Sequence, residues 1–204
     1  MHVLLIAASP SATSRSAALL DAAGVALERS GVRVRRLSLR ELPAEALLRA
    51  RVTDSKLGLA LAQVADAGAV VLATPIYKAA YSGLLKVFLD LLPQDGLHGK
   101  WVWPLATGGS PAHTLALDHS LRPVLDNLGA HQVVPAVYAL DAQIALQRDG
   151  HAALVDAAIQ GRLQAGVERL AQALDAQCHW HERAQTHEGL AITPALFGAA
   201  RCSA

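Results

Sequence analysis

Short apolar runs alternate with amphipathic stretches along almost the whole chain. Most of the runs are apolar at nearly every position, which is typical of parallel strands covered on both faces of a sheet. Val32–Leu37 instead alternates between apolar and basic residues closely enough to predict a strand near the sheet edge with one face exposed to solvent. The predicted strands are Val3–Ala8, Val32–Leu37, Ala69–Thr74, Lys100–Thr107 and Ala130–Tyr138.

Apolar residues at helical spacing fill most of the intervals between these runs. Leu20, Ala23 and Leu27, for example, lie on one side of the first predicted helix. Pro75 is expected to end the third strand because proline cannot donate to the ladder. Pro123 predicts an irregularity within its helix. The predicted helices are Ser14–Glu28, Ala44–Leu48, Ser55–Ala67, Ser82–Leu92, Asp118–Leu128 and Ala152–Ala176.

Strands joined by helices imply an α/β, doubly wound architecture: a parallel sheet with right-handed crossovers and helices on both faces. We place this domain at residues 1–176 and expect residues 177–204 to form a tail that is flexible or docked at an interface. Ligands of such sheets bind outside the carboxyl ends of the strands. The informative loops are therefore Ser9–Ser16, Thr74–Ser82 and Thr107–His113.

The loop after the first strand is rich in hydroxyl groups at the point where a helix begins. It holds four serines, one threonine and Arg15 within Ser9–Ser16. Free backbone N–H groups and the positive end of the helix dipole meet there, which favours an anion, most often a phosphate. The glycine spacing of the dinucleotide motif and the Gly-Lys-Ser/Thr ending are both missing. We therefore expect hydroxyls and Arg15 to hold the phosphate.

The other two loops suit a planar ring. Apolar and aromatic residues follow Pro75 and offer a flat surface, whereas Gly108 and Gly109 let the backbone approach a ligand and present N–H groups to its carbonyl oxygens. A phosphate at the first loop, a ring at the second and polar ring edges at the third together describe a mononucleotide such as FMN.

The motifs of these loops resemble those of a known family. They are Ala8-Ser9-Pro10 with Ser14-Arg15-Ser16, the run ATPIYKAAYSGLLK from Ala73, the run LDLLP from Leu89 and the run PLATGG from Pro104. Residues 1–175 resemble the NAD(P)H-dependent FMN reductases of the flavodoxin-like superfamily. Within that family the chain resembles the SsuE type, which serves alkanesulfonate and methanesulfonate monooxygenases.

The resemblance implies a five-stranded sheet of order 2-1-3-4-5 and a homodimer or homotetramer. A cytoplasmic location is expected from the reduced cysteines and from the lack of a predicted signal peptide or membrane span. It also implies hydride transfer from C4 of NADPH or NADH to N5 of FMN, which is a substrate or is loosely bound. The reduced FMN would pass to an FMNH2-dependent monooxygenase in sulfonate sulfur assimilation. Hydride transfer between stacked rings needs no protein acid or base, so no catalytic side chain is expected.

Carried over position by position, the resemblance assigns three groups of FMN contacts. The phosphate contacts are Ser9, Ser14, Arg15 and Ser16. The contacts beside the ring are Thr74, Pro75, Ile76, Tyr77 and Lys78. The contacts with the ribityl chain and the pyrimidine edge are Thr107, Gly108, Gly109 and Ser110.

The chain departs from the family pattern at two positions. Ala8 replaces the usual glycine before the first-loop serine, which is tolerable if that residue does not need a positive φ. His119 stands where many SsuE-type members carry an extra tyrosine that widens a helical turn at the tetramer interface. The related methanesulfonate branch carries a histidine there.

Several of these side chains have simpler structural interpretations. Ser14 is also a good N-cap whatever binds nearby. Tyr77 and Tyr81 would also suit interface packing. Lys86 and Asp90, at i and i+4, form either a surface pair or a contact across subunits.

The histidines and cysteines leave further alternatives. His113 and His119 are candidates for nicotinamide or interface contact, or are satisfied helix histidines. Cys178, with the histidines that follow it, and Cys202 offer zinc ligand types, but their spacing matches no known finger, so we expect no metal. We expect both cysteines to be reduced thiols.

Composition narrows the function classes. The chain has 204 residues, a formal net charge of +1 and no basic cluster, which argues against nucleic-acid binding. Hydrophobic residues make up 52% and charged residues only 17%, so some apolar surface is expected against another subunit. No signal peptide is predicted, because the N-terminus lacks a basic region, a long apolar run and a cleavage site. No membrane span is predicted either, because no apolar stretch reaches about 18 residues.

Two other functions fit the same fold. One is a quinone, azo or metal-oxyanion reductase that retains its flavin. The other is a non-enzymatic, flavodoxin-like electron carrier. Such carriers are usually strongly acidic, and the net charge of +1 argues against this role.

Overall fold

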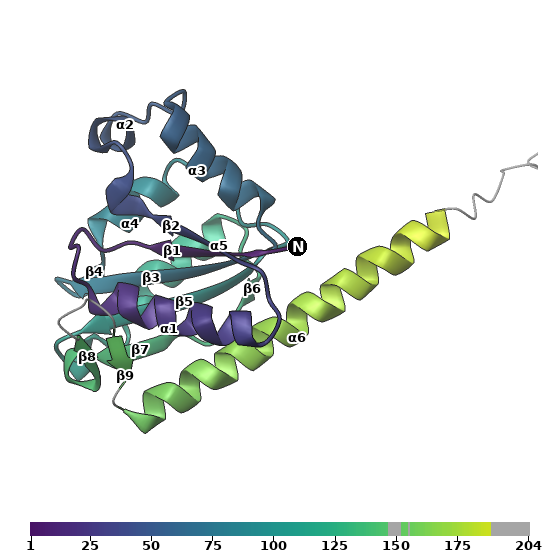
Figure 1. Ribbon diagram of the computed structural model, residues 1–204. Coiled ribbons are helices and arrows are strands. Elements are labelled where there is room, and N and C mark those ends of the chain that lie inside the picture. The colour runs from purple at the N-terminus through teal and green to yellow at the C-terminus, as the bar shows by residue number, and fades with distance from the viewer. Residues whose placement is uncertain (147–151, 155, 189–204) are drawn as a thin grey trace, which may run out of the picture.

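The computed structural model describes residues 1–146, 152–154 and 156–188. It shows one twisted sheet between two layers of helices (Figure 1). The strands are β1 Val3–Ala7, β2 Val34–Ser38, β3 Ala69–Tyr77, β4 Ala80–Tyr81, β5 Trp101–Gly108, β6 Gln132–Val133, β7 Val137–Leu140, β8 Ile144–Leu146 and β9 Ala152–Leu154. The helices are α1 Arg15–Arg29, α2 Ala44–Leu48, α3 Ser55–Asp66, α4 Gly83–Leu89, α5 Arg122–Asn127 and α6 Ala157–Glu188.

The strand order confirms the predicted topology. The main sheet runs β2-β1-β3-β5-β6, with β7 also on β5 and the short β4 antiparallel to β3. All other pairings in this sheet are parallel. With β6 and β7 together as the fifth strand, this is the flavodoxin-like order 2-1-3-4-5.

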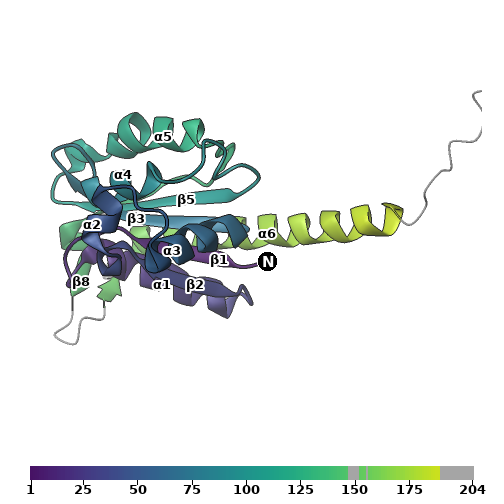
Figure 2. The same cartoon turned by 90° about the horizontal axis from the view of Figure 1, so that it is seen from above.

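Both faces of the sheet are covered, which explains why β1 and β3 are apolar at nearly every position. Leu4 and Ile6 of β1 belong to the core beneath α2, α3, α4 and α5. Val3 and Leu5 point the other way, into the core beneath α1 and α6. Figure 2 shows α5 and α1 on opposite sides of the sheet.

The third strand continues past Pro75, so the expectation that proline would end it was wrong. β1 leaves the sheet after Ala7, which pairs with Ala73, and the last bond on that side is the one that Ala8 N donates to Ala73 O. Strand residues alternate sides, so position 75 faces the same side as Ala73, where its N–H would have met the Ala8 carbonyl. Pro75 lacks this N–H, and the Ser82 hydroxyl donates to the Ala8 carbonyl instead, while the strand stays paired with β5 through Thr107.

The fifth predicted strand is broken into β6 and β7. Val134 N donates to Val102 O at 2.9 Å, and pairing with β5 resumes only at Leu105 and Val137. By alternation, Pro104 faces the same neighbour as Val102 but has no N–H to offer. The missing N–H of Pro104 therefore accounts for the interruption.

The irregularity predicted around Pro123 is present. Leu117–Leu121 forms a π-helical segment, and α5 follows with Pro123 in its first turn. Short 3-10 turns lie at Leu39–Glu41, Pro111–His113 and Asp141–Gln143.

The last predicted helix begins later than expected. Ala152–Leu154 pairs with β8 as strand β9, and α6 starts at Ala157, where Asp156 accepts a hydrogen bond from Ile159 N at 2.9 Å. The helix continues to Glu188 and projects beyond the sheet in both ribbon views. The expected boundary between domain and tail at residue 176 therefore falls inside this helix.

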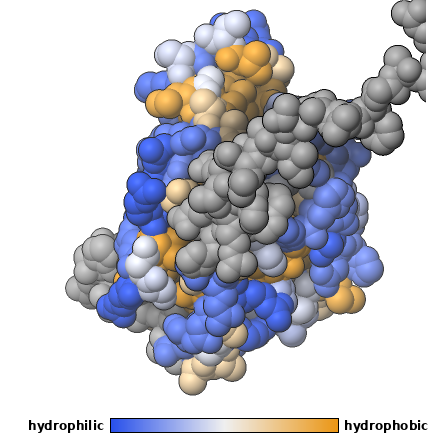
Figure 3. Space-filling view, turned by 90° about the vertical axis from the view of Figure 1, so that its right-hand side faces the viewer, coloured by the Kyte–Doolittle hydropathy of each residue, from blue (hydrophilic) through white to orange (hydrophobic). Residues whose placement is uncertain are grey.

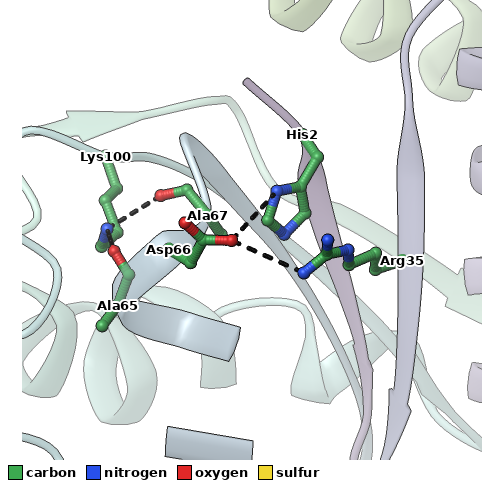
Figure 4. Close-up of polar contacts among 6 residues, drawn as sticks. All are labelled: His2, Arg35, Ala65, Asp66, Ala67 and Lys100. Atoms are coloured by element: carbon green, nitrogen blue, oxygen red, sulfur yellow. Dashed lines mark hydrogen bonds and ion pairs between the residues drawn. The ribbon is translucent and has the colours of Figure 1, made fainter. Parts of the chain in front are cut away.

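A polar cluster fastens α3 at the amino ends of the strands (Figure 4). Lys100 Nζ donates to the carbonyls of Ala65 and Ala67 at 2.7 and 2.8 Å, at the C-terminal end of α3. Asp66 lies 3.5 Å from Arg35 and 3.9 Å from His2. Burial, followed by the charge of Arg35, lowers the pKa of His2, which favours its neutral form.

Figure 3 views this amino end of the sheet, opposite to the three loops. It is largely hydrophilic, with an apolar area at the top, where Figure 1 places α3. Leu59 of α3 is exposed. Among the described residues, no helix has the length and apolar character needed to cross a membrane.

Substitution of two glycines of α6 is expected to have opposite effects on stability. A Cβ at Gly166 would overlap the ring of Trp103, which is fully buried, whereas Gly161 has open space around it. Gly166→Ala should lower the free energy of unfolding by about 1–3 kcal/mol. Gly161→Ala should raise it by about 0.5–1 kcal/mol through helix propensity. Urea titration followed by circular dichroism measures both, and shifts of the same sign would contradict this packing.

Candidate functional site

The three predicted loops leave the same edge of the sheet, on the left in Figure 1. The parallel register aligns Ala7 with Ala73 and Pro75 with Thr107, so the carboxyl ends of β1, β3 and β5 lie side by side. The arrangement predicted from the sequence is therefore present.

The first loop presents unpaired donors at the start of α1. Ser14 is the N-cap, with Oγ accepting from Ala17 N at 3.3 Å and lying 2.9 Å from Ser16 Oγ. Ser9 and Ser16 are buried, and Ser9 Oγ accepts from Ser11 N. Within the described part of the chain, the backbone N–H groups of Arg15 and Ser16 have no acceptor.

This arrangement fits a phosphate. Unpaired N–H groups at the start of a fifteen-residue helix, with hydroxyls beside them, form the anion site expected from the helix dipole. Ser14 thus caps the helix, as the simpler interpretation had it, and still lies among the donors. Ala8 has no positive φ, which explains how it replaces the usual glycine.

Arg15 is oriented by a distant segment. Its Nε donates to the carbonyl of Ile144, at the start of β8, at 3.3 Å. Among the described residues this is the only hydrogen bond of the guanidinium, so the two terminal nitrogens keep their donors for an anion. The sequence carried no signal for this contact between residues 129 positions apart.

The second loop is a β-hairpin, which corrects the expected loop over Thr74–Ser82. Tyr77 pairs with Ala80, and Lys78 and Ala79 between them have φ values of 51° and 62°. Two central residues in the left-handed region define a type I′ turn, which normally takes Gly or Asn. Neither residue is glycine, so this turn stores backbone strain.

The hairpin exposes one aromatic side chain and buries its neighbour. Tyr77 is 51% exposed at the tip, whereas Ile76 is buried. Tyr81 packs against the core, and burial raises the pKa of its hydroxyl. Its short strand lies against the π-helical segment.

Ser82 connects the first two loops, a role that the sequence reasoning did not assign. Its hydroxyl donates to the carbonyl of Ala8 at 2.6 Å and accepts from Leu85 N at 3.2 Å, as the N-cap of α4. Its own N–H donates to Thr74 Oγ1 at 2.9 Å. Serine before an amphipathic run does signal an N-cap, but the partner on β1 is visible only in the fold.

The third loop is held in place by Tyr138, which the sequence reasoning also did not identify. Tyr138, on β7, donates from its hydroxyl to the carbonyl of Ser110 at 2.7 Å. Ser110 Oγ in turn caps the following 3-10 turn by accepting from Ala112 N at 3.2 Å. Thr107 is buried, and Gly108 and Gly109 follow it.

The remaining candidates surround these loops. Lys86 and Asp90 form an i, i+4 pair at the surface at 2.5 Å, one of the two alternatives offered by the sequence, and this hydrogen bond raises the pKa of Lys86. His113 is half-buried and donates its backbone N–H to Ser110 O at 3.2 Å, whereas His119 is exposed on the π-helical segment.

The expectation of no metal concerns residues that the structure does not fully describe. Among the described residues, no three His, Cys, Asp or Glu side chains lie together as metal ligands would. The side chains of Cys178 and of the histidines after it, and all of Cys202, lie outside the described part.

Comparison with known proteins decides the family. The family described as NADPH-dependent FMN reductase matches residues 1–144, which include all three loops. The chain belongs to this family. An FMN reductase (NADPH) of Escherichia coli K12 is 42% identical over 174 residues, covering 85% of this chain and 90% of that one. The corresponding Pseudomonas putida KT2440 protein is 41% identical, covering 85% and 88%.

Solved structures agree with the family and the fold. The apo form of an NADH:FMN oxidoreductase, EMOB, has a TM-score of 0.76 at 38% identity, covering 84% of this chain and 89% of that one. A Streptococcus pneumoniae flavodoxin, at 16% identity and a TM-score of 0.56, covers 84% and 98%. The second similarity shows a flavodoxin-like fold only.

Removing the Ser82 hydroxyl is expected to loosen the edge where the first two loops meet. Ser82→Ala leaves the buried Ala8 carbonyl and the Leu85 N–H without their partner, which should cost about 1–3 kcal/mol of unfolding free energy. Ser30→Ala is the control, because its hydroxyl bonds to Ala26 O at the surface and its loss should cost less than about 0.5 kcal/mol. Equal losses in urea titrations would contradict the proposed role of Ser82.

Proposed function

We propose that this chain transfers hydride from nicotinamide C4 of NADPH or NADH to N5 of FMN. The observation that carries the proposal is that the family match spans three loops whose ends meet at one sheet edge, with unpaired donors at the start of α1. The chemistry comes from the two cofactors, since FMN accepts the hydride at N5. The chain's own residues bind and orient them.

The first loop would hold the phosphate. Backbone N–H groups of Arg15 and Ser16, the hydroxyls of Ser9, Ser14 and Ser16, and the Arg15 guanidinium suit three acceptor oxygens. The bond from Arg15 Nε to Ile144 O fixes the plane of the guanidinium before any ligand arrives. Pre-orientation of this kind reduces the entropy lost on binding.

The second and third loops would hold the ring. Thr74, Pro75, Ile76, Tyr77 and Lys78 lie on the β3–β4 hairpin, whose type I′ turn fixes the exposed Tyr77 at its tip. Beyond Thr107 and Gly108, the N–H groups of Gly109 and Ser110 have no acceptor among the described residues. Such donors would bind the pyrimidine edge and stabilise negative charge on the reduced ring.

The product is proposed to leave as free reduced FMN for an FMNH2-dependent sulfonate monooxygenase. The resemblance to the SsuE type supports this role, and an NADH-dependent FMN reductase SfnE of Pseudomonas putida is 32% identical, covering 83% of this chain. The homodimer or homotetramer, the cytoplasmic location and the roles of Tyr81, His113 and His119 remain predictions.

Steady-state kinetics test the reaction. Purified protein should oxidise NADPH or NADH only with added FMN, by a sequential mechanism, and should be nearly colourless after dialysis. In a coupled assay with an alkanesulfonate monooxygenase, it should support sulfite release. A permanently yellow protein with ping-pong turnover of quinones would instead indicate a flavin-retaining reductase. Failure to oxidise either nucleotide with FMN would favour an electron carrier.

Arg15→Ala is expected to distinguish FMN from riboflavin, since only FMN carries the phosphate. Loss of a charged hydrogen bond should raise the dissociation constant of FMN about 10- to 100-fold, whereas that of riboflavin should change less than about 2-fold. Arg29→Ala, in the last turn of the same helix, should change neither. Fluorescence titration with both flavins measures this, and equal weakening of both would show that Arg15 does not contact the phosphate.

A further inference from the structure

The third loop rests on one buried hydroxyl group. Tyr138 is only 6% exposed, and its ring belongs to the apolar core beneath α2, α3, α4 and α5. Its hydroxyl nevertheless donates a hydrogen bond to the carbonyl of Ser110, 28 residues earlier in the sequence, at 2.7 Å. A phenylalanine would fill the same apolar space without that bond.

The bond lies where the sheet no longer holds the loop. Ladder pairing of β5 with β7 ends at Gly108 and Leu140. Beyond it, the Ser110 carbonyl precedes Pro111 and takes part in the 3-10 turn by accepting from His113 N at 3.2 Å. The hydrogen bond from Tyr138 of β7 therefore fixes the peptide group between Ser110 and Pro111. This peptide group lies next to the unpaired N–H groups of Gly109 and Ser110.

Gly108 leaves space for the Tyr138 hydroxyl, because glycine has no Cβ. A Cβ at this position would lie 2.5 Å from Tyr138 Oη but 3.3 Å from Cζ, the ring carbon that bears the hydroxyl. Gly108 has no positive φ, so the close approach of the hydroxyl, and not backbone conformation, accounts for glycine here. The pair Gly108 and Tyr138 therefore forms one steric unit.

The hydroxyl keeps its proton at ordinary pH. Burial raises the pKa of Tyr138, and the nearby Asp141 carboxylate raises it further. A protonated phenol can donate to a carbonyl, whereas a phenolate could not. The bond is thus present throughout the range in which flavin reduction would be assayed.

We propose that Tyr138 is a positioning residue for the flavin ring: its hydroxyl holds the Gly109–Ser110 donors in the orientation that the pyrimidine edge requires. The inference rests on the proposed function, because it takes the third loop as a contact for the flavin. Tyr138 itself does not touch the reacting atoms.

Tyr138→Phe tests the proposal. The variant should raise the dissociation constant of FMN about 3- to 10-fold, the effect of one hydrogen bond. The dissociation constant of riboflavin should rise by the same factor, because the loop contacts the ring and not the phosphate. The kcat at saturating FMN should change less than about 2-fold, with the loss appearing in KM for FMN. Unchanged flavin affinity, with only a lower melting temperature, would reduce Tyr138 to a structural role and overturn the proposal.

The steric unit supplies a second, independent measurement. Gly108→Ala should weaken FMN strongly in the wild-type background, because the added methyl displaces the Tyr138 hydroxyl. In the Tyr138→Phe background the same methyl meets only ring carbons at 3.3 and 3.4 Å, so the double variant should bind FMN more tightly than Gly108→Ala alone. An equal effect in both backgrounds would contradict the geometry. Wild-type protein that binds no FMN would instead refute the proposed function.

Discussion

The parallel register of β1, β3 and β5 is the constraint on which the rest of this structure depends. It aligns Ala7 with Ala73 and Pro75 with Thr107, and so brings three loops from distant parts of the sequence to one edge. Helices on both faces cover the apolar side chains and leave this edge free for chemistry (Figure 1). Donors for a phosphate and for a ring edge can then act on a single ligand.

Hydrogen bonds between elements hold the loops at this edge in fixed positions. Ser82 bonds to the Ala8 carbonyl, Arg15 to the Ile144 carbonyl and Tyr138 to the Ser110 carbonyl. In each case a side chain donates to a backbone carbonyl of another element. Among the described residues, the backbone N–H groups of Arg15, Ser16, Gly109 and Ser110 in these loops have no acceptor. Such donors are oriented before a ligand binds, which reduces the entropy lost on binding.

The prolines in the sheet show which strand breaks can be predicted from the sequence and which cannot. Pro75 was expected to end β3 and does not, because its missing N–H faces β1 at the end of their pairing, whereas the pairing with β5 on the other side continues. Pro104 does interrupt the neighbouring pairing, because its missing N–H faces the fifth strand. Whether a proline breaks a strand thus depends on which neighbour its missing donor would have met.

The sequence by itself determined the element order, the two-faced burial and the three loops, because apolar periodicity and hydroxyl or glycine clusters are local properties. It also determined the N-cap at Ser14. The tertiary structure alone decided the β3–β4 hairpin, the split of the fifth strand, the β8–β9 pair before α6 and the roles of Ser82 and Tyr138. Each of these depends on a partner that is distant in sequence or on strand alternation, and no local pattern specifies such a partner.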